Sequence, residues 1–465
     1  MSKTSTVLTS GTPWKVLLKY NLPLLGSAVF QQIYTIADTV IAGKFAGESA
    51  LAAVGASLSI VSIFMAVALG ANAGCAVMVA RYFGANDKKK TLSAVLSSAI
   101  GFFALGIVLL IAGIFTSGPL LRLLGTPESV MEESVLYLNV YIAGFPSLIM
   151  YNLATGIYSA LGDSKTPFFF LVGSSLGNIL LDYIFTATLG WGVAGVAWAT
   201  FVTQTAACLL TIVFLAFRLK KIHAEAKSEA AEQETDRPTN PAFSFALLGA
   251  IFLAALPVIL QNSFISVGNL FIQRIVNSYG ESALAGYTAG SKIIIFCCTC
   301  FNTLGTGLTN YSSQNLGAGE IKRIRQGFWC GMAISAIVAL ALFAAVFTFS
   351  ETFVRLFLDD ASSEATLRYG MNYIRIVSPF FVLVTVKISA DCVVRGCGGN
   401  FGFMVSTFTD LLLRVAFSFI LSPAVGLSSV FWGWDIGWSA GTVIALIFYC
   451  NIPALKRLRK NKAAA

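Results

Sequence analysis

Charged residues are scarce in this chain of 465 residues, because Asp, Glu, Lys and Arg together make up only 11% of it. A soluble protein carries roughly a quarter charged residues, so a soluble globular fold is excluded. Hydrophobic residues account for 56% of the chain, and its mean hydropathy is +0.78. This composition is typical of a chain that lies mostly within a lipid bilayer.

Histidine is nearly absent, and the cysteines form no metal-binding pattern. The single histidine, His223, lies in a charged segment, and the densest cysteine group is Cys297, Cys298 and Cys300. That group has no matching second cluster, and buried cysteine behaves as a small apolar residue. A membrane-embedded enzyme would need a convergent nucleophile, metal site or acid–base pair. We therefore expect no enzyme, no metal site and no cofactor.

The apolar residues form long runs, each near the roughly 20 residues that a helix needs to cross the hydrocarbon layer. The sequence predicts an all-α, polytopic membrane protein with twelve transmembrane helices, near residues 14–43, 51–81, 91–116, 135–161, 166–189, 192–217, 243–278, 283–315, 328–350, 370–394, 402–421 and 433–454.

The chain has a net charge of +9, and its basic residues are unevenly distributed along the sequence. With an even number of spans both termini lie on one side, and that side would hold 22 of the 31 Lys and Arg residues. An excess of basic residues on one side sets orientation during insertion. The start of the chain, Met1–Pro13, is polar and shows no signal-peptide pattern. We expect a bacterial inner-membrane protein with cytoplasmic termini, the lipid bilayer as partner and no nucleic-acid partner.

The sequence contains an internal duplication. Residues Gly47–Ala52 recur letter for letter as Gly280–Ala285, 233 residues later. At nearly the same offset, Gly84-Ala85 matches Gly317-Ala318, and Leu22-Pro23 matches Leu256-Pro257. Several matches in the same order indicate duplication, so we expect two six-helix bundles.

A polar stretch separates the two copies. We predict an N-terminal lobe over 1–217, a cytoplasmic linker over 218–241 and a C-terminal lobe over 242–465. Because each lobe has an even number of spans, both enter the membrane in the same sense. A pseudo-two-fold axis along the membrane normal should relate them, with a substrate site between them. This architecture favours a transporter by analogy of fold.

Two carboxylates lie within predicted spans of the first lobe. Asp38 follows Tyr34 by four residues, and Asp182 follows Asn178 by four, so each acid shares a helix face with a polar partner. Neither has a basic residue within four positions. An ionisable residue inside a bilayer is costly and indicates function, although each Asp could instead hydrogen-bond a neighbouring helix. Removal from water favours the protonated form, so the two acids suit the uptake of H⁺ or Na⁺.

The second lobe carries both signs of charge. Lys387–Asp391 and Asp410–Arg414 have i, i+4 spacing, which is typical of self-neutralising pairs. An alternative hypothesis is that Lys387, with the isolated Lys292, contacts an anionic or polar group of the substrate. In the first span, Pro23 removes a backbone hydrogen bond and permits a kink, static or moving.

Several of these segments resemble the multidrug and toxic compound extrusion family, in particular its DinF-like bacterial branch. The motifs that carry the resemblance are residues 37–43, 84–85, 161–167, 178–182 and 192–197, in family order along nearly the whole chain. The resemblance implies antiport of drugs or metabolites against H⁺ or Na⁺ by a monomer. It implies a cation site in the first lobe, formed by Tyr34, Asp38, Asn178, Asp182 and Thr200, with Asn152 nearby and Pro23 as the bending point.

The substrate expected from the resemblance is a small organic molecule, with Gln261 on the seventh helix as a further possible contact beside Lys292 and Lys387. The alternative is a flippase for a lipid-linked saccharide or another anionic amphiphile, for which a basic cavity would be expected. Lys292 keeps that alternative open, whereas the paired acids Asp38 and Asp182 argue against it.

Overall fold

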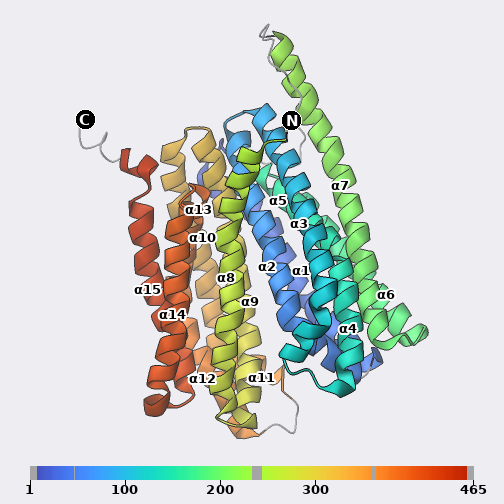
Figure 1. The fold of residues 1–465 in the computed structure, drawn as a ribbon. Coiled ribbons are helices and arrows are strands. Elements are labelled where there is room, and N and C mark those ends of the chain that lie inside the picture. Colours follow the sequence, from blue (N-terminus) through green and yellow to red (C-terminus); the bar gives the residue numbers. More distant parts are fainter. Residues whose placement is uncertain (1–7, 47, 233–242, 359–362, 458–465) are drawn as a thin grey trace. The chain divides into compact units, whose positions relative to one another are not determined.

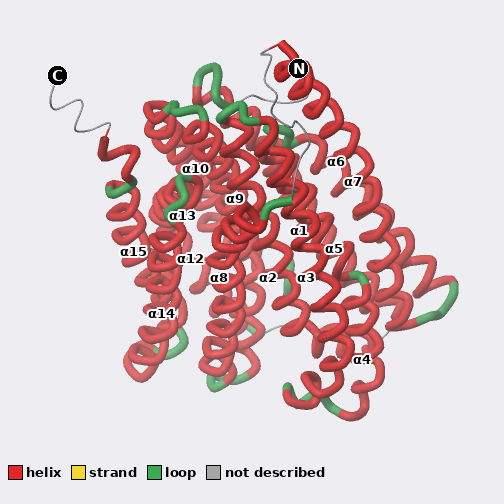
Figure 2. Tube along the Cα trace, turned by 45° about the horizontal axis from the view of Figure 1, so that its top comes forward, coloured by secondary structure: helices red, strands yellow, loops and turns green. Residues whose placement is uncertain are grey.

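The computed structural model describes residues 8–46, 48–232, 243–358 and 363–457. The described part of the chain is almost entirely helical and contains no strand (Figure 2). Part of the predicted linker, Gly47 of the repeat and the basic residues Lys3, Arg237, Arg459, Lys460 and Lys462 of the predicted inner side lie outside the described residues.

The helices of the first copy, coloured from blue to light green in Figure 1, follow the predicted spans and continue beyond their ends. They are α1 (Pro13–Ile41), α2 (Glu48–Gly84), α3 (Lys88–Leu123), α4 (Glu128–Ala143), α5 (Phe145–Ala160), α6 (Lys165–Asp182) and α7 (Gly192–Glu232). Two π-helical segments, η1 (Ala42–Ala46) and η2 (Tyr183–Thr188), extend α1 and α6. The predicted fourth span is a bent pair, because α4 and α5 meet at 45° around Gly144.

The second copy repeats this order. Its helices are α8 (Phe245–Asn277), α9 (Glu281–Gly317), α10 (Ile321–Thr348), the short α11 (Ser350–Arg355), α12 (Glu364–Val377), α13 (Phe381–Gly396), α14 (Asn400–Val425) and α15 (Ser428–Cys450). A single 3-10 turn, η3 (Ser378–Phe380), joins α12 to α13, so that these two correspond to α4 and α5.

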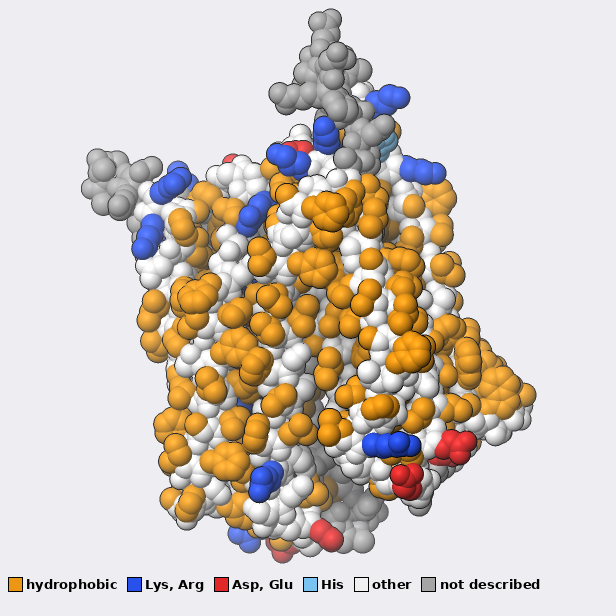
Figure 3. All heavy atoms as spheres, viewed as in Figure 1, with side chains coloured by type: hydrophobic (Ala, Val, Ile, Leu, Met, Phe, Trp, Pro, Cys, Tyr) orange, Lys and Arg blue, Asp and Glu red, His pale blue; other side chains and the backbone are white. Residues whose placement is uncertain are grey.

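Ten helices in the described ranges are long and apolar enough to cross a membrane, and the bent pair α4–α5 makes eleven. Helix α1 has 29 residues and is long enough to cross the hydrocarbon layer, although Gln31, Gln32 and Asp38 reduce its apolar character. On the face drawn in Figure 3, hydrophobic side chains cover the helix flanks, and charged side chains lie mostly near the helix ends. Outward-facing residues such as Phe115 and Phe217 suit contact with lipid.

The chain forms two compact units that do not coincide with the predicted lobes. Unit 1 contains Gly26–Asn262, and unit 2 contains Leu8–Leu25 and Ser263–Ala465 as far as these are described. The first part of α1 therefore packs in unit 2, and the first part of α8 packs in unit 1. The predicted linker also differs, because residues 218–232 continue α7 as a helix.

Close helix packing within each unit explains why the first part of α1 belongs to unit 2 and the first part of α8 to unit 1. In unit 1, a Cβ on Gly74 of α2 would lie only 2.8 Å from the Cβ of Ala255, so α2 and α8 approach closely. In unit 2, the Asn310 amide donates to the hydroxyl of the fully buried Tyr20 at 3.0 Å. Both contacts join residues far apart in sequence, which is why the repeat alone did not predict the unit boundaries.

Arg323 holds the segment before α1 against unit 2. Its guanidinium donates to the backbone carbonyls of Gly11 at 2.8 Å and of Leu8 and Ser10 at 3.3 Å. Its Nε donates to Asn315, whose amide in turn donates to the Leu8 carbonyl at 3.1 Å. The Leu8 side chain is fully buried as a result.

We expect Arg323→Ala to destabilise this attachment by about 2 kcal/mol, because hydrogen bonds from a charged donor to three carbonyls are lost. Limited proteolysis before α1 should become faster, and the midpoint of thermal unfolding should fall. The exposed neighbour Arg325 provides the control, and Arg325→Ala should change neither quantity. Equal cleavage rates for both variants would contradict the role of Arg323.

Candidate cation and substrate site

The predicted polar pairs of α1 and α6 meet inside unit 1. The Tyr34 hydroxyl donates a hydrogen bond to the Asn178 carboxamide oxygen. One turn further along each helix, the carboxyl groups of Asp38 and Asp182 are electrostatic neighbours. Helical spacing places the two members of each pair on one face, and tertiary packing turns the two faces toward each other.

Within the described ranges, neither of the two carboxyl groups forms a salt bridge. Asp182 is 1% exposed, and among the described residues its carboxylate oxygens accept no hydrogen bond from an N–H or hydroxyl group, so that only a proton shared with the Asp38 carboxyl group can bridge them. One oxygen of Asp38 is also buried and without a partner within that part of the chain. Two ionised acids in such surroundings are strongly unfavourable, so a bound proton or small cation would stabilise the pair.

Both acids lie where an α-helix changes to a π-helix. Segment η2 follows Asp182 directly, and η1 begins four residues after Asp38. The Thr186 hydroxyl donates to the Asp182 backbone carbonyl, and the Phe45 ring packs edge-on against Tyr183 with centroids 5.4 Å apart. Local π-helical turns occur frequently at functional sites because they redirect side chains and loosen the backbone ladder.

A cavity of about 470 Å³ with both polar and apolar side chains on its wall lies one helical turn from the acids, at Tyr34 and Asn178. Four of the predicted site residues, Tyr34, Asn152, Asn178 and Thr200, line it. The side-chain amide of Asn152 donates to the Leu148 carbonyl, and the Asn152 backbone carbonyl accepts from the Asn72 side-chain amide at 2.9 Å, which joins α5 to α2. The structure thus brings the six predicted cation-site residues into one region of unit 1.

Sequence reasoning missed several polar residues around this cavity. Tyr137 of α4 is an electrostatic neighbour of both acids. Other polar lining residues are Gln31, Tyr141, Tyr151, Ser174, Ser175, Thr203 and Gln204. Their spacing is the signal that was available, because Thr200, Thr203 and Gln204 recur on one face of an otherwise apolar helix.

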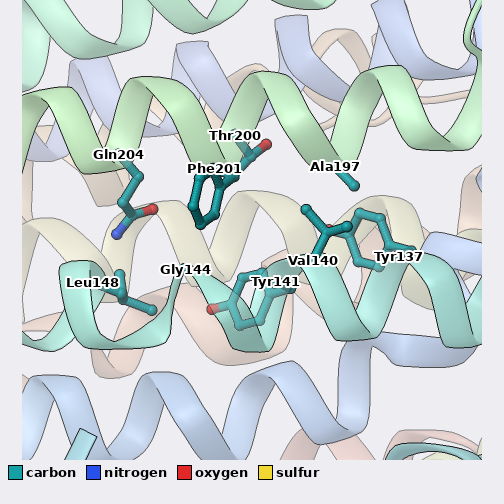
Figure 4. A pocket seen from close by; sticks show the side chains of 9 residues that line it. All are labelled: Tyr137, Val140, Tyr141, Gly144, Leu148, Ala197, Thr200, Phe201 and Gln204. Carbon is teal, nitrogen blue, oxygen red and sulfur yellow. The ribbon is translucent and has the colours of Figure 1, made fainter. Parts of the chain in front are cut away.

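The wall between α4 and α7 contains a further small pocket of about 10 Å³ (Figure 4). In Figure 4, Phe201 and Gln204 extend from α7 toward Tyr141 and Leu148. Thr200 and Gln204 line both this pocket and the larger cavity. Ring and amide groups therefore lie along one continuous wall, which suits an organic molecule with polar substituents.

The remaining predicted residues lie elsewhere. Helix α1 runs without a break through Pro23, which belongs to the part of α1 in unit 2. Lys292 is exposed, with its ammonium 5.2 Å from the centroid of the Phe357 ring. Gln261 is half-buried on α8. Their proposed roles in bending and substrate contact stay predictions.

Lys387 is buried in an ion network of unit 2. Its ammonium lies 3.1 Å from Asp391 and 3.4 Å from Asp410, and Asp410 accepts from Arg414 at 3.1 Å. The two i, i+4 pairs predicted from the sequence are thus present, and Lys387 also joins them across α13 and α14. Glycine makes room for the network, because a Cβ on Gly441 of α15 would lie 2.4 Å from Lys387 Cε.

We expect Tyr34→Phe to lower the free energy of unfolding by about 1–2 kcal/mol, because the buried Asn178 oxygen loses its donor. Thermal unfolding of the purified protein measures this. Tyr183→Phe is the matched control, since half of the Tyr183 side chain is exposed and its ring contact with Phe45 is kept. A Tyr34→Phe protein as stable as the control would contradict the assigned hydrogen bond.

Comparisons with known proteins agree with this architecture. The family model MatE matches the chain twice, over residues 23–184 and 257–420, and the two segments begin 234 residues apart. The chain is 25% identical over 440 residues to the probable multidrug resistance protein YoeA of Bacillus subtilis, covering 93% of this chain and 92% of YoeA. It is 26% identical over 442 residues to the probable multidrug resistance protein YpnP of the same organism, covering 95% and 96%.

A solved structure with the same fold is the outward-facing conformation of a multidrug resistance MATE family transporter of the MOP superfamily. It aligns with a TM-score of 0.89 at 24% identity, over 98% of this chain and 99% of that one. The two matched segments of the family model cover most of both repeats. The chain therefore belongs to the MatE family, the multidrug and toxic compound extrusion family that its motifs resemble.

Proposed function

We propose that this protein is a cation-coupled antiporter that exports small organic molecules, such as drugs, toxins or metabolites, from the bacterial cytoplasm by alternating access. It would act as a monomer in the plasma membrane with both termini in the cytoplasm. The observation that carries the proposal is the neighbouring carboxyl pair Asp38–Asp182, which forms no salt bridge with the residues that the structure describes and lies one helical turn from a cavity. The names of the relatives YoeA and YpnP support export of drugs.

The carboxyl pair would couple the cation to the substrate through charge. With H⁺ or Na⁺ bound, the pair is neutralised and tolerates burial; without the cation, its charge disfavours the same packing. The Asn178 and Thr200 oxygens and the Tyr34 hydroxyl are available to a bound Na⁺, and the carboxylates alone suffice for H⁺. A change in the packing of α1 against α6 is the direct consequence of binding, since the pair joins these two helices.

A neighbouring cavity allows the cation to influence the substrate. Tyr34 and Asn178 are hydrogen-bonded to each other, and both line the 470 Å³ cavity. A shift of α1 therefore alters the cavity wall. Aromatic and amide groups on that wall can hold an organic molecule by stacking and hydrogen bonding. Binding of the cation would then prevent substrate binding or lower the affinity for the substrate, and the reverse would also hold, as antiport requires.

The proposal is tested by efflux from proteoliposomes in which a proton gradient and a sodium gradient are imposed separately. We use a fluorescent cationic dye as the transported probe. We expect one of the two ion gradients to drive the dye against its own concentration gradient. The arm that drives efflux identifies the coupling ion. An efflux rate that is the same without any gradient as with either gradient imposed would contradict coupling.

A further inference from the structure

Helix α15 carries a buried acid that the sequence analysis did not single out. Asp435 is 2% exposed, and neither of its carboxylate oxygens has a hydrogen-bond partner within the described ranges. Its backbone carbonyl accepts from the Ser439 hydroxyl, as expected for regular helix, so only the side chain is left without a partner. Burial of an ionised carboxylate in this manner is strongly unfavourable.

Three helices, α12, α13 and α14, pack against α15. The charged residues of α12, Glu364, Arg368 and Arg375, are exposed, and Arg395 of α13 donates to Thr309, whereas the buried charged groups of α13 and α14 neutralise one another. Helix α13 contributes Lys387 and Asp391, and α14 contributes Asp410 and Arg414. Lys387 bonds both carboxylates, and Arg414 bonds Asp410. Two cations thus balance two anions, and Asp435 is an additional acid for which this network supplies no counter-charge.

Aromatic side chains lie near Asp435. Tyr373 of α12 is its electrostatic neighbour, and the Tyr373 ring packs at a tilt against Phe431, one turn before Asp435, with centroids 4.8 Å apart. The Tyr287 ring of α9 also packs against Tyr373, with centroids 5.2 Å apart. Arg414 stacks its guanidinium on the adjacent Trp434 at 3.6 Å while it bonds Asp410.

The surroundings of Asp435 indicate whether it would bind a metal cation or a proton. A metal cation needs several oxygen ligands, and neither carboxylate oxygen of Asp435 has a hydrogen-bonding group beside it among the residues that the structure describes. A proton needs no ligand besides the carboxylate itself, and it removes the charge that makes burial unfavourable. The aromatic setting around Asp435 therefore fits a proton and not a metal ion.

We propose that Asp435 is a proton-binding site of unit 2, separate from the Asp38–Asp182 pair, and that its carboxyl group is protonated in the conformation described here. Binding forms the O–H bond of a carboxylic acid from the carboxylate and one proton, and release reverses this. A role for that proton in antiport rests on the proposed function, whereas its presence on Asp435 does not.

Infrared spectroscopy of the purified full-length protein at neutral pH tests the site directly. The double variant Asp38→Asn/Asp182→Asn removes the carboxyl pair of unit 1. In that background we expect the carbonyl stretch of a protonated carboxylic acid, shifted by deuterium exchange. The same band should vanish when Asp435→Asn is added. A background without the band, or a band that survives Asp435→Asn, would overturn the assignment.

Thermal unfolding gives a second and independent readout. Asparagine has the shape of the protonated acid, so Asp435→Asn should unfold at the wild-type temperature or above. Asp410→Asn, the matched variant on α14, should unfold at a lower temperature because it leaves buried cations in excess. A loss from Asp435→Asn as large as that from Asp410→Asn would show an ionised, partnered Asp435 and refute the proposal.

The two proposals can fail separately. If the band belongs to Asp435 and no ion gradient drives efflux in proteoliposomes, antiport is refuted and the proton site stands. If a gradient drives efflux and the band is absent, the proton site alone is refuted. If both hold and the proton gradient is the one that drives efflux, the number of protons exchanged per dye molecule should be smaller in Asp435→Asn than in the wild type.

Discussion

Replacing Asp38 or Asp182 by Asn is expected to abolish efflux driven by the coupling-ion gradient, with a fall of at least about tenfold in the initial rate. Tenfold corresponds to about 1.4 kcal/mol, well below the cost of an uncompensated buried charge. The reason is that an amide neither gains a proton nor attracts Na⁺, so the pair can no longer change its charge when the ion arrives. Proteoliposomes loaded with dye measure the rate.

The same variants should remain folded. Asp182 is buried, and among the described residues its oxygens accept no hydrogen bond from an N–H or hydroxyl group, so a neutral residue of the same shape removes an unfavourable charge. The midpoint of thermal unfolding should therefore stay constant or rise. Asp87→Asn is the matched control, because Asp87 accepts from the Lys90 amide at the start of α3 and Asn serves equally well at that position. Full-rate efflux by Asp38→Asn would remove Asp38 from the mechanism.

Replacing Lys387 by Met is expected to destabilise the protein by about 3–5 kcal/mol, the usual cost of leaving a buried ion without its partner. Lys387 is 5% exposed and bonds two carboxylates, so its loss leaves one negative charge in excess in unit 2. Thermal and chemical unfolding of the purified protein measure the change.

A double variant checks the charge balance behind this expectation. Lys387→Met with Asp391→Asn retains the Asp410–Arg414 pair and removes one charge of each sign. It should therefore recover most of the stability that the single variant loses. Lys292→Met is the control, since this lysine is exposed and its contact with Phe357 contributes about 0.5–1 kcal/mol. A single variant of wild-type stability would contradict the ion network.

The same two lysine variants decide the predicted substrate contacts. If Lys387 only neutralises its network, Lys387→Met with Asp391→Asn should export the same range of dyes as the wild type. If Lys292 contacts an anionic group of the substrate, Lys292→Met should lose anionic probes and keep cationic ones. Efflux assays with a matched pair of anionic and cationic dyes separate these outcomes.

The amino-acid sequence by itself determined the spans, their order and the duplication, because hydrophobic length and recurring motifs are local properties. It also determined that Tyr34 shares a face with Asp38 and Asn178 with Asp182, since helical periodicity depends only on spacing. The self-neutralising pairs of α13 and α14 follow from the same i, i+4 rule.

Only the tertiary structure decided which of these faces meet. It paired Asp38 with Asp182, brought Tyr137 beside them, and joined Lys387 to Asp410 across two helices. It also placed the first parts of α1 and α8 in units other than those of their repeats, and left the carboxylate of Asp435 without a hydrogen-bond partner in the part of the chain that the structure describes. The physical reason is that a helix sequence fixes the direction of its side chains around its own axis, whereas their partners depend on how neighbouring helices pack.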